Sequence, residues 1–228
     1  MKKIAFISSV CAVLATAAVA DNNDIWINQM GNGNVVGDAL NPVTQIGNQN
    51  EMTLTQGGDG NAIGSRSLQQ SPAPTWPGAT QLGYSQKMVV TQPGNRNSAE
   101  LLLQKGGSNN DMSIRQSGND NRIVNSHQHG DQNTSDVVQS GNRNFGNATQ
   151  VGANNLLEVL QSGNDNDYDV WQGGFASGTQ PGACQSCDIL IRQGGHDNSA
   201  NVWQQDTSQM AQVIQSGSGN SAYTKQMR

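Results

Sequence analysis

The sequence predicts an all-β protein: a β-solenoid of stacked two-strand coils, with amyloid-like cross-β hydrogen bonds between coils. A hexad, Gln-x-Gly-x-x-Asn, recurs about every eleven residues along the 228-residue chain. Such a fixed short period is typical of stacked repeat architectures. The segments between hexads have the length and the alternating pattern of strands. A helix is disfavoured, because glycine returns in every repeat and asparagine is a weak helix former.

The hexad occurs in twelve complete copies and four partial ones. The complete copies begin at Gln29, Gln45, Gln56, Gln92, Gln104, Gln116, Gln128, Gln139, Gln150, Gln161, Gln193 and Gln215. The partial copies begin at Gln81, Gln172, Gln180 and Gln204. Two strands and two turns take about 22 residues, so these hexads predict about eight coils, roughly 4.7–4.8 Å apart. A meander of β-hairpins is the competing arrangement.

The first twenty residues have the pattern of a secretory signal peptide and are expected to lie outside the fold. Lys2 and Lys3 form a basic start, residues 4–19 an apolar run, and residues 18–20 a small-residue cleavage site before Asp21. The mature chain, residues 21–228, is therefore expected to be secreted. Cleavage would also remove Cys11.

The composition of the chain disfavours several classes of partner. Only 13% of the residues are charged and 4% are aromatic, and the net charge is -5. The basic residues are scattered, so no stripe for nucleic acid or a membrane surface is predicted. Composition alone is compatible with a disordered, prion-like segment, but the strict period favours order.

In each strand segment, the hexad Asn and the following Gln lie six residues apart and therefore share one face of the strand. The inward face from Asn155 to Gln161 also carries Leu157 and Val159. The first mature strand, residues 23–29, follows the same rule. Four residues, x-Gly-x-x, are expected to link successive strands, because glycine adopts backbone angles that other residues reach only at a cost.

The inward amides are expected to form hydrogen-bonded ladders. A buried amide without a partner costs about 1–3 kcal/mol, and a stack satisfies each amide when every layer repeats it. The predicted ladder residues are Gln29, Gln45, Asn50, Gln56, Asn61, Gln92, Asn97, Gln104, Gln116, Asn121, Gln128, Asn133, Gln139, Asn144, Gln150, Asn155, Gln161, Asn166, Gln172, Gln193, Asn198, Gln204, Gln215, Asn220 and Gln226. The predicted turn glycines are Gly31, Gly47, Gly58, Gly94, Gly118, Gly130, Gly141, Gly152, Gly163, Gly195 and Gly217.

Three intervals interrupt the period, near residues 35–44, 62–80 and 173–192. The interval from Gln56 to Gln81 is interpreted as nearly one full coil whose turn has become a proline-rich loop at residues 71–78. Proline cannot donate to a strand ladder, so this loop is expected to bulge outward. The third interval is expected to hold a degenerate strand at residues 175–179.

The only cysteines outside the leader, Cys184 and Cys187, form a possible disulfide, with free loop thiols as the alternative. No two further ligands lie at zinc spacing. The histidines are His127, His129 and His196, and the first two are expected to be solvated at a turn. The sequence therefore predicts no catalytic residues, no metal and no cofactor, and the protein is not expected to be an enzyme.

The unit Gln-x-Gly-x-x-Asn-x-Ala-x-x-x-Gln resembles the curlin repeat. The fullest matches run from residue 193 to 204 and from residue 215 to 226, and the resemblance covers nearly all of residues 23–226. It implies a subunit of curli, the extracellular amyloid fibres of bacterial biofilms, which serve in surface adhesion. The implied partners are copies of the chain, other curlin subunits, an outer-membrane curli secretion pore and accessory chaperones. No nucleic acid is required.

Two further questions stay open at this level. The early first strand and residues 208–211 resemble a minor, nucleating curlin, but a major subunit is the alternative. The charged turn residues Arg96, Asp120, Arg143 and Asp165 are interpreted either as solvated turns or as groups that keep fibres apart. A monomeric secreted solenoid that binds a ligand, or an adhesin module, is the other functional class.

Overall fold

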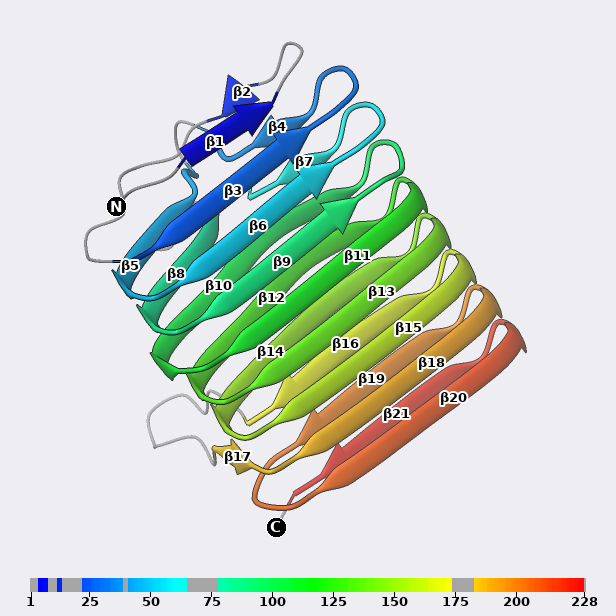
Figure 1. Ribbon diagram of the computed structural model, residues 1–228. Helices are drawn as coiled ribbons and strands as arrows, with labels where there is room; N and C mark the ends of the chain where they lie inside the picture. Colours follow the sequence, from blue (N-terminus) through cyan, green and yellow to red (C-terminus); the bar gives the residue numbers. More distant parts are fainter. Residues whose placement is uncertain are drawn as a thin grey trace.

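The computed structural model describes residues 4–7, 12–13, 22–38, 41–64, 78–173 and 183–227. Within these ranges all regular secondary structure is β, and the chain winds into a solenoid with two parallel sheets (Figure 1). The predicted fold class is therefore confirmed. Each strand pairs in parallel with its counterpart one coil away, for example β13 with β15. This pairing excludes the hairpin meander, in which neighbouring strands would be antiparallel.

The first sheet contains β1 (Ile4–Ile7), β3 (Asp24–Gln29), β6 (Glu51–Gln56), β9 (Lys87–Gln92), β11 (Asp111–Asn119), β13 (Thr134–Asn142), β15 (Leu156–Asn164), β18 (Asp188–His196) and β20 (Met210–Ser218). The strands from β3 to β20 begin coils 1 to 8 in that order. Figure 1 shows β1 and β20 at opposite ends of the stack.

The second sheet follows the path β2 (Ala12–Val13), β4 (Val35–Val36), β7 (Ala62–Ile63), β10 (Ser98–Ser108), β12 (Arg122–Asp131), β14 (Phe145–Ala153), β16 (Asp167–Gln172), β19 (Ser199–Gln204) and β21 (Ser221–Gln226). Beside this path, β5 (Thr44–Asn48) pairs with β8 (Ala79–Tyr84), β8 pairs with β10, and β17 (Cys184–Gln185) pairs with β14. The described residues thus form eight coils, each with a side in both sheets.

The core is a narrow apolar layer between the two sheets. Alternate residues of each strand point into it, as in β18, where Ile189 and Ile191 are buried while Arg192 is exposed. Because the strands pair in register, equivalent residues of successive coils stack on one another; Gln139 pairs with Gln161. A two-residue side-chain period and parallel in-register pairing together keep the same positions inside in every coil.

The strands extend further than predicted. In coil 5, β13 runs through the hexad to Asn142, so the corner contains fewer non-strand residues than the expected four-residue link. At this corner Arg143 has a left-handed φ of 54°. The reason is that the hexad backbones of neighbouring coils pair as well: Gly141 lies opposite Gly163.

In the uncleaved chain, two segments of the predicted leader pair with coil 1. Ile4 lies opposite Ile25 in the first sheet, and Ala12 lies opposite Val35 in the second. From their signal-peptide pattern, residues 1–20 were expected to lie outside the fold. An apolar segment can add to the open edge of a parallel sheet, which explains the difference.

The interval between Gln56 and Gln81 differs from its sequence interpretation. It forms one side of coil 2 rather than nearly a full coil, because β7 and β8 both pair with β10. β7 is followed by Gly64 and β8 is preceded by Gly78, so the insertion lies between these two strands. The proline-rich residues 71–77 and the expected strand at residues 175–179 lie outside the described residues. In coil 1, β4 and β5 flank a smaller insertion in the same way.

Candidate functional site: the amide ladders and the ends of the stack

Two uninterrupted ladders of glutamines run the length of the stack. In the first sheet, each Nε2 donates to the Oε1 of the next coil at 2.7–3.0 Å, in the order Gln29, Gln56, Gln92, Gln116, Gln139, Gln161, Gln193, Gln215. In the second sheet the order is Gln45, Gln81, Gln104, Gln128, Gln150, Gln172, Gln204, Gln226, at 2.7–3.4 Å. Gln180 lies outside the described residues, and Gln226 completes the second ladder.

Both glutamine ladders have a direction, since every Nε2 points toward the C-terminal coil. An interior amide such as that of Gln193 donates twice, to the backbone oxygen of Asp167 and to Gln215. At the last coil, the Nε2 of Gln215 and that of Gln226 each donate to one backbone oxygen. An amide nitrogen carries two hydrogens, so each retains one donor facing off the end.

At the N-terminal end of the stack, the ladders end in acceptors instead of donors. The Oε1 atoms of Gln29 and Gln45 are buried and have no hydrogen-bond partner. A buried acceptor left in this state costs about 1–3 kcal/mol. The two ends of the stack are therefore complementary at both glutamine ladders: acceptors at coil 1 and donors at coil 8.

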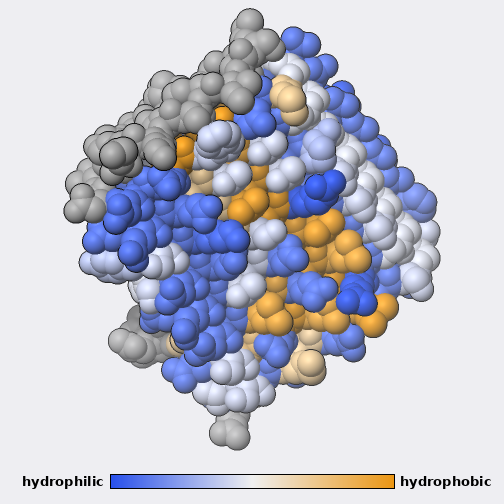
Figure 2. Space-filling view, viewed as in Figure 1, coloured by the Kyte–Doolittle hydropathy of each residue, from blue (hydrophilic) through white to orange (hydrophobic). Residues whose placement is uncertain are grey.

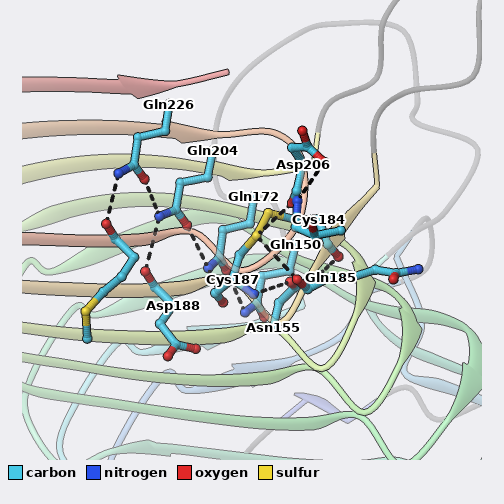
Figure 3. Close-up of a disulfide and its surroundings, with 12 residues drawn as sticks. Gln150, Asn155, Gln172, Cys184, Gln185, Cys187, Asp188, Gln204, Asp206 and Gln226 are labelled. Carbon is cyan, nitrogen blue, oxygen red and sulfur yellow. Dashed lines mark hydrogen bonds between the residues drawn. A yellow bond between two sulfur atoms is a disulfide. The ribbon is translucent and has the colours of Figure 1, made fainter. Parts of the chain in front are cut away.

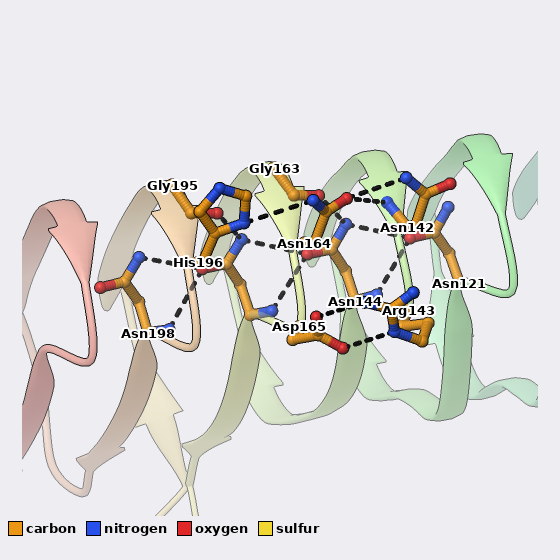
Figure 4. A network of polar contacts seen from close by, with 11 residues as sticks. Asn121, Asn142, Arg143, Asn144, Gly163, Asn164, Asp165, Gly195, His196 and Asn198 are labelled. Atoms are coloured by element: carbon orange, nitrogen blue, oxygen red, sulfur yellow. Dashed lines mark hydrogen bonds and ion pairs between the residues drawn. The ribbon is translucent and has the colours of Figure 1, made fainter.

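One complete asparagine ladder accompanies the glutamines. Each backbone N–H donates to the Oδ1 of the preceding coil at 2.9–3.2 Å, in the order Asn34, Asn61, Asn97, Asn121, Asn144, Asn166, Asn198, Asn220. Each side chain also ties its corner together. The Nδ2 of Asn144 donates to the carbonyl of Gly163 and to the Oδ1 of Asn121 (Figure 4). It also lies 3.4 Å from the carbonyl of Ser140 in its own corner.

The second asparagine column is less regular. It contains Asn23, Asn50, Gln86, Asn110, Asn133, Asn155 and Cys187. The complete hexad that begins at Gln104 ends at Asn109, but that residue has a left-handed φ of 57° and the buried residue of the column is Asn110. One extra residue at this corner causes the shift. Asn34, Gln81 and Asn110 were missed as ladder residues, although a complete hexad ends at Asn34 and a partial one begins at Gln81.

The predicted turn glycines are required by the close approach of successive coils. At Gly141, φ is 108°, and an added Cβ would meet the carbonyl of Gly163 in the next coil. Gly94 differs, because its φ is not left-handed, yet its Cβ would meet the carbonyl of Gly118 in the same way. The glycine column is therefore set by stacking as well as by backbone angles.

Cys184 and Cys187 form a buried disulfide at the corner between coils 6 and 7 (Figure 3). Cys184 lies opposite Gly152, in the glycine column. Cys187 takes the asparagine position, because its N–H donates to the Oδ1 of Asn155 and its carbonyl accepts from Gln172. The disulfide thus replaces the side-chain bonds by which an asparagine ties this corner.

Two of the histidines lie within a strand and are not the solvated turn residues predicted from the sequence. His127 and His129 lie on β12 rather than at a turn, with parallel rings 6.4 Å apart. Burial lowers the pKa of His127 to about 4, and the charges of His129 and Lys105 add to the effect. Burial also lowers the pKa of His129.

The exposed corners carry their own polar column. Arg96 pairs with Asp120, and Arg143 with Asp165, each at 2.7 Å. The guanidinium hydrogen bonds lower the pKa of both carboxyl groups. Beside them, Asn142 donates to Asn164 (Figure 4). These pairs are solvent-exposed, so their contribution to stability is small.

No protein-family model matches the chain, and no curated protein matches it. Within the described ranges there is no helix with the length and apolarity needed to cross a membrane. Among the same residues, no three His, Cys, Asp or Glu side chains converge in a way that could hold a metal ion. The ladders and the two ends of the stack are thus the distinctive chemistry of the part that the structure describes.

Proposed function

We propose that the chain is a structural subunit of an extracellular, curli-type amyloid fibre in a bacterial biofilm matrix, where it serves in surface adhesion. Copies of the mature chain stack end to end, so that the cross-β hydrogen bonds of one copy continue into the next. Other curlin subunits, a secretion pore and accessory chaperones are its further partners, as the repeat resemblance implies.

The observation that carries this proposal is the complementarity of the two ends. Gln29 and Gln45 present unpartnered acceptors, and Gln215 and Gln226 retain donors at the equivalent places of coil 8. Stacking coil 8 of one copy on coil 1 of the next would extend both ladders without a change of direction. Proteins usually protect open strand edges because they template pairing with other chains. In the mature chain, cleavage of the leader would remove β1 and β2 from coil 1, and this edge would be the working surface.

Polymerisation of residues 21–228, diluted from denaturant at micromolar concentration, tests the proposal. We expect fibres with a meridional reflection at about 4.7–4.8 Å. A short lag would favour a nucleator, and a long lag abolished by seeds would favour a major subunit. A stable strand-rich monomer would contradict the fibre proposal and favour a monomeric adhesin or ligand-binding solenoid.

A proline variant tests whether the C-terminal edge is the surface that grows. Ser199 N–H donates to the carbonyl of Asn220, and Gln205 N–H to that of Gln226. In the alternation of a parallel ladder, the N–H of Tyr223 therefore points off the end of the stack. Tyr223→Pro removes this donor and is tolerated on an edge strand. We expect slowed or abolished elongation from the C-terminal end, with Tyr223→Ala as the matched control that elongates normally.

A further inference from the structure

The outer face of the first sheet in coils 6 to 8, here named the lateral face, has an unusual side-chain pattern. Three outward residues per strand stack in register between β15, β18 and β20. They are Leu156, Glu158 and Leu160 in coil 6, Asp188, Leu190 and Arg192 in coil 7, and Met210, Gln212 and Ile214 in coil 8. Apolar and polar side chains alternate in both directions, with Leu190 at the centre.

Four of the five apolar members of the lateral face are exposed, and Leu190 at its centre is half-buried. Leu156 is 41% exposed and Leu160 39%, although both lie in an interior coil, and Met210 and Ile214 are exposed to 72% and 64%. Figure 2 shows apolar side chains gathered over the later strands of the sheet that faces the viewer. Exposed apolar side chains that gather on one sheet face, here interspersed with polar ones, mark an interaction surface.

We infer that this face pairs two copies of the chain side by side, through a two-fold axis that runs along the stack. Such an axis places each strand against its own copy in the reversed direction. Asp188 then faces Arg192 of the second copy, and Arg192 faces Asp188. Leu156 meets Leu160, Met210 meets Ile214, and Leu190 meets itself. One patch thus complements itself, as an isologous interface requires.

The charges distinguish this axis from the alternative in-plane axis along the strands. That axis would place Asp188 against Asp188 and Arg192 against Arg192, which is unfavourable at a desolvated contact. The axis along the stack also opposes Asp111 to Arg115 in coil 4, since these residues hold the same two positions of β11. In a fibre it would align two stacks with the same polarity.

Two carboxylates meet their own copies under the proposed axis. Glu158 is compensated within its own chain by Arg192, at 3.5 Å. Asp136 on β13 lies opposite Glu158, one coil earlier. It would meet its own copy without a compensating charge, so the lateral face is taken to end at coil 6. Sheets that pack face to face lie about 10 Å apart, so the side chains of the nine positions would fill the space between two copies.

A charge swap tests the pairing and distinguishes it from a purely intramolecular role of Arg192. Arg192→Asp places only carboxylates at the opposed positions, so we expect at least about tenfold weaker pairing. The double variant Asp188→Arg with Arg192→Asp restores opposite charges across the axis and should pair again. The contact between residue 192 and Glu158 is lost in both variants, so pairing that returns in the double variant does not depend on it.

Sedimentation velocity of freshly folded protein and mass per length of any fibres provide the readouts. We expect pairs of solenoids for the unchanged chain and single ones for Arg192→Asp. Leu190→Asp should also give single solenoids, whereas Asn201→Asp, on the second sheet of the same coil, should not. Circular dichroism verifies that each variant folds. Single solenoids for the unchanged chain, or a double variant that pairs no better than Arg192→Asp, would overturn the inference.

The pairing goes beyond the proposed function, because two solenoids can pair whether or not they stack end to end. If no fibres form, sedimentation alone decides the pairing, and the fibre proposal fails independently. If fibres form as single stacks, the fibre proposal stands and the pairing is wrong.

Discussion

The ring of Tyr168 fills the space into which a side chain at Gly146 would project. The two residues stack in register on β16 and β14, and a Cβ added to Gly146 would overlap the ring atoms of Tyr168. Tyr168 is fully buried, so it cannot move outward without opening the core. A glycine in one coil therefore leaves the space that the tyrosine ring of the next coil occupies in the narrow core.

This relationship predicts that Gly146→Ala destabilises the solenoid. Overpacking a buried position costs about 1–3 kcal/mol, and the unfolding midpoint in guanidinium should fall accordingly. The same substitution should cost little in a Tyr168→Ala background, because the ring is then absent. Gly57→Ala is the control: its Cβ would approach the Cα of Pro93 only to 3.7 Å, an ordinary contact. Equal effects of both alanine variants would contradict the packing argument.

Substitution within a glutamine ladder should cost more than substitution on the surface. Gln139 accepts from Gln116 and donates to Gln161, both at 2.9 Å. Gln139→Ala leaves an acceptor and a donor without their ladder partners, and each buried unpaired group costs about 1–3 kcal/mol. Gln185→Ala, at an exposed glutamine on β17 outside the lateral face, should change the unfolding free energy by less than about 0.5 kcal/mol. Denaturant titration of both variants provides the comparison.

The disulfide should matter most for the last two coils. The ladder bond that joins coils 6 and 7, from Gln172 to Gln204, is the longest of its ladder at 3.4 Å. Reduction removes the covalent tie at the same junction, and for so short a loop we expect a loss of about 1–2 kcal/mol. Hydrogen exchange should become faster in residues 188–226 than in residues 111–164.

A matched variant separates the covalent tie from the shape of this corner. Cys184→Gly with Cys187→Asn recreates the repeat at the two positions that the disulfide occupies. We expect this double variant to be insensitive to reductant and as stable as the oxidised chain. If the double variant were as unstable as the reduced chain, cysteine would not be substituting for the repeat residues.

Acid should destabilise coils 3 to 5 through His127. The pKa of His127 lies at about 4 in the fold, against an ordinary value of 6.5, because burial disfavours the charged form. Folding therefore favours the neutral ring. The associated stability is complete above about pH 6.5 and is lost as the pH falls toward 4, by at most about 3 kcal/mol.

His127→Thr, which introduces the residue of the next coil at Thr149, isolates this effect. The difference in unfolding free energy between this variant and the unchanged chain should shift between pH 6.5 and pH 4. Carboxylates titrate in both proteins, so they cancel in the comparison. A difference that stays constant over this range would show that His127 does not carry the acid sensitivity.

The hexad period was sufficient to predict the β-solenoid and about eight coils. Parallel stacking imposes one strict condition: a buried amide must recur in every layer, and that condition is visible in sequence as Gln and Asn at fixed spacing. For the same reason, the spacing alone assigns the ladder glutamines from Gln29 to Gln226, with the exception of Gln81. Residues of the insertions do not have to recur in every coil, so no repeated pattern in the sequence predicts their structure.

Only the tertiary structure decided how individual layers meet. One extra residue moves the ladder position from Asn109 to Asn110, and an insertion makes the interval after Gln56 one side of a coil. Cys184 takes the place of a repeat glycine and Cys187 that of a repeat asparagine, and both assignments depend on the residues of the neighbouring coil. The packing of Tyr168 at Gly146 depends on a neighbouring coil in the same way. The direction of the amide ladders, which makes the two ends complementary, likewise arises from contacts between coils about 22 residues apart.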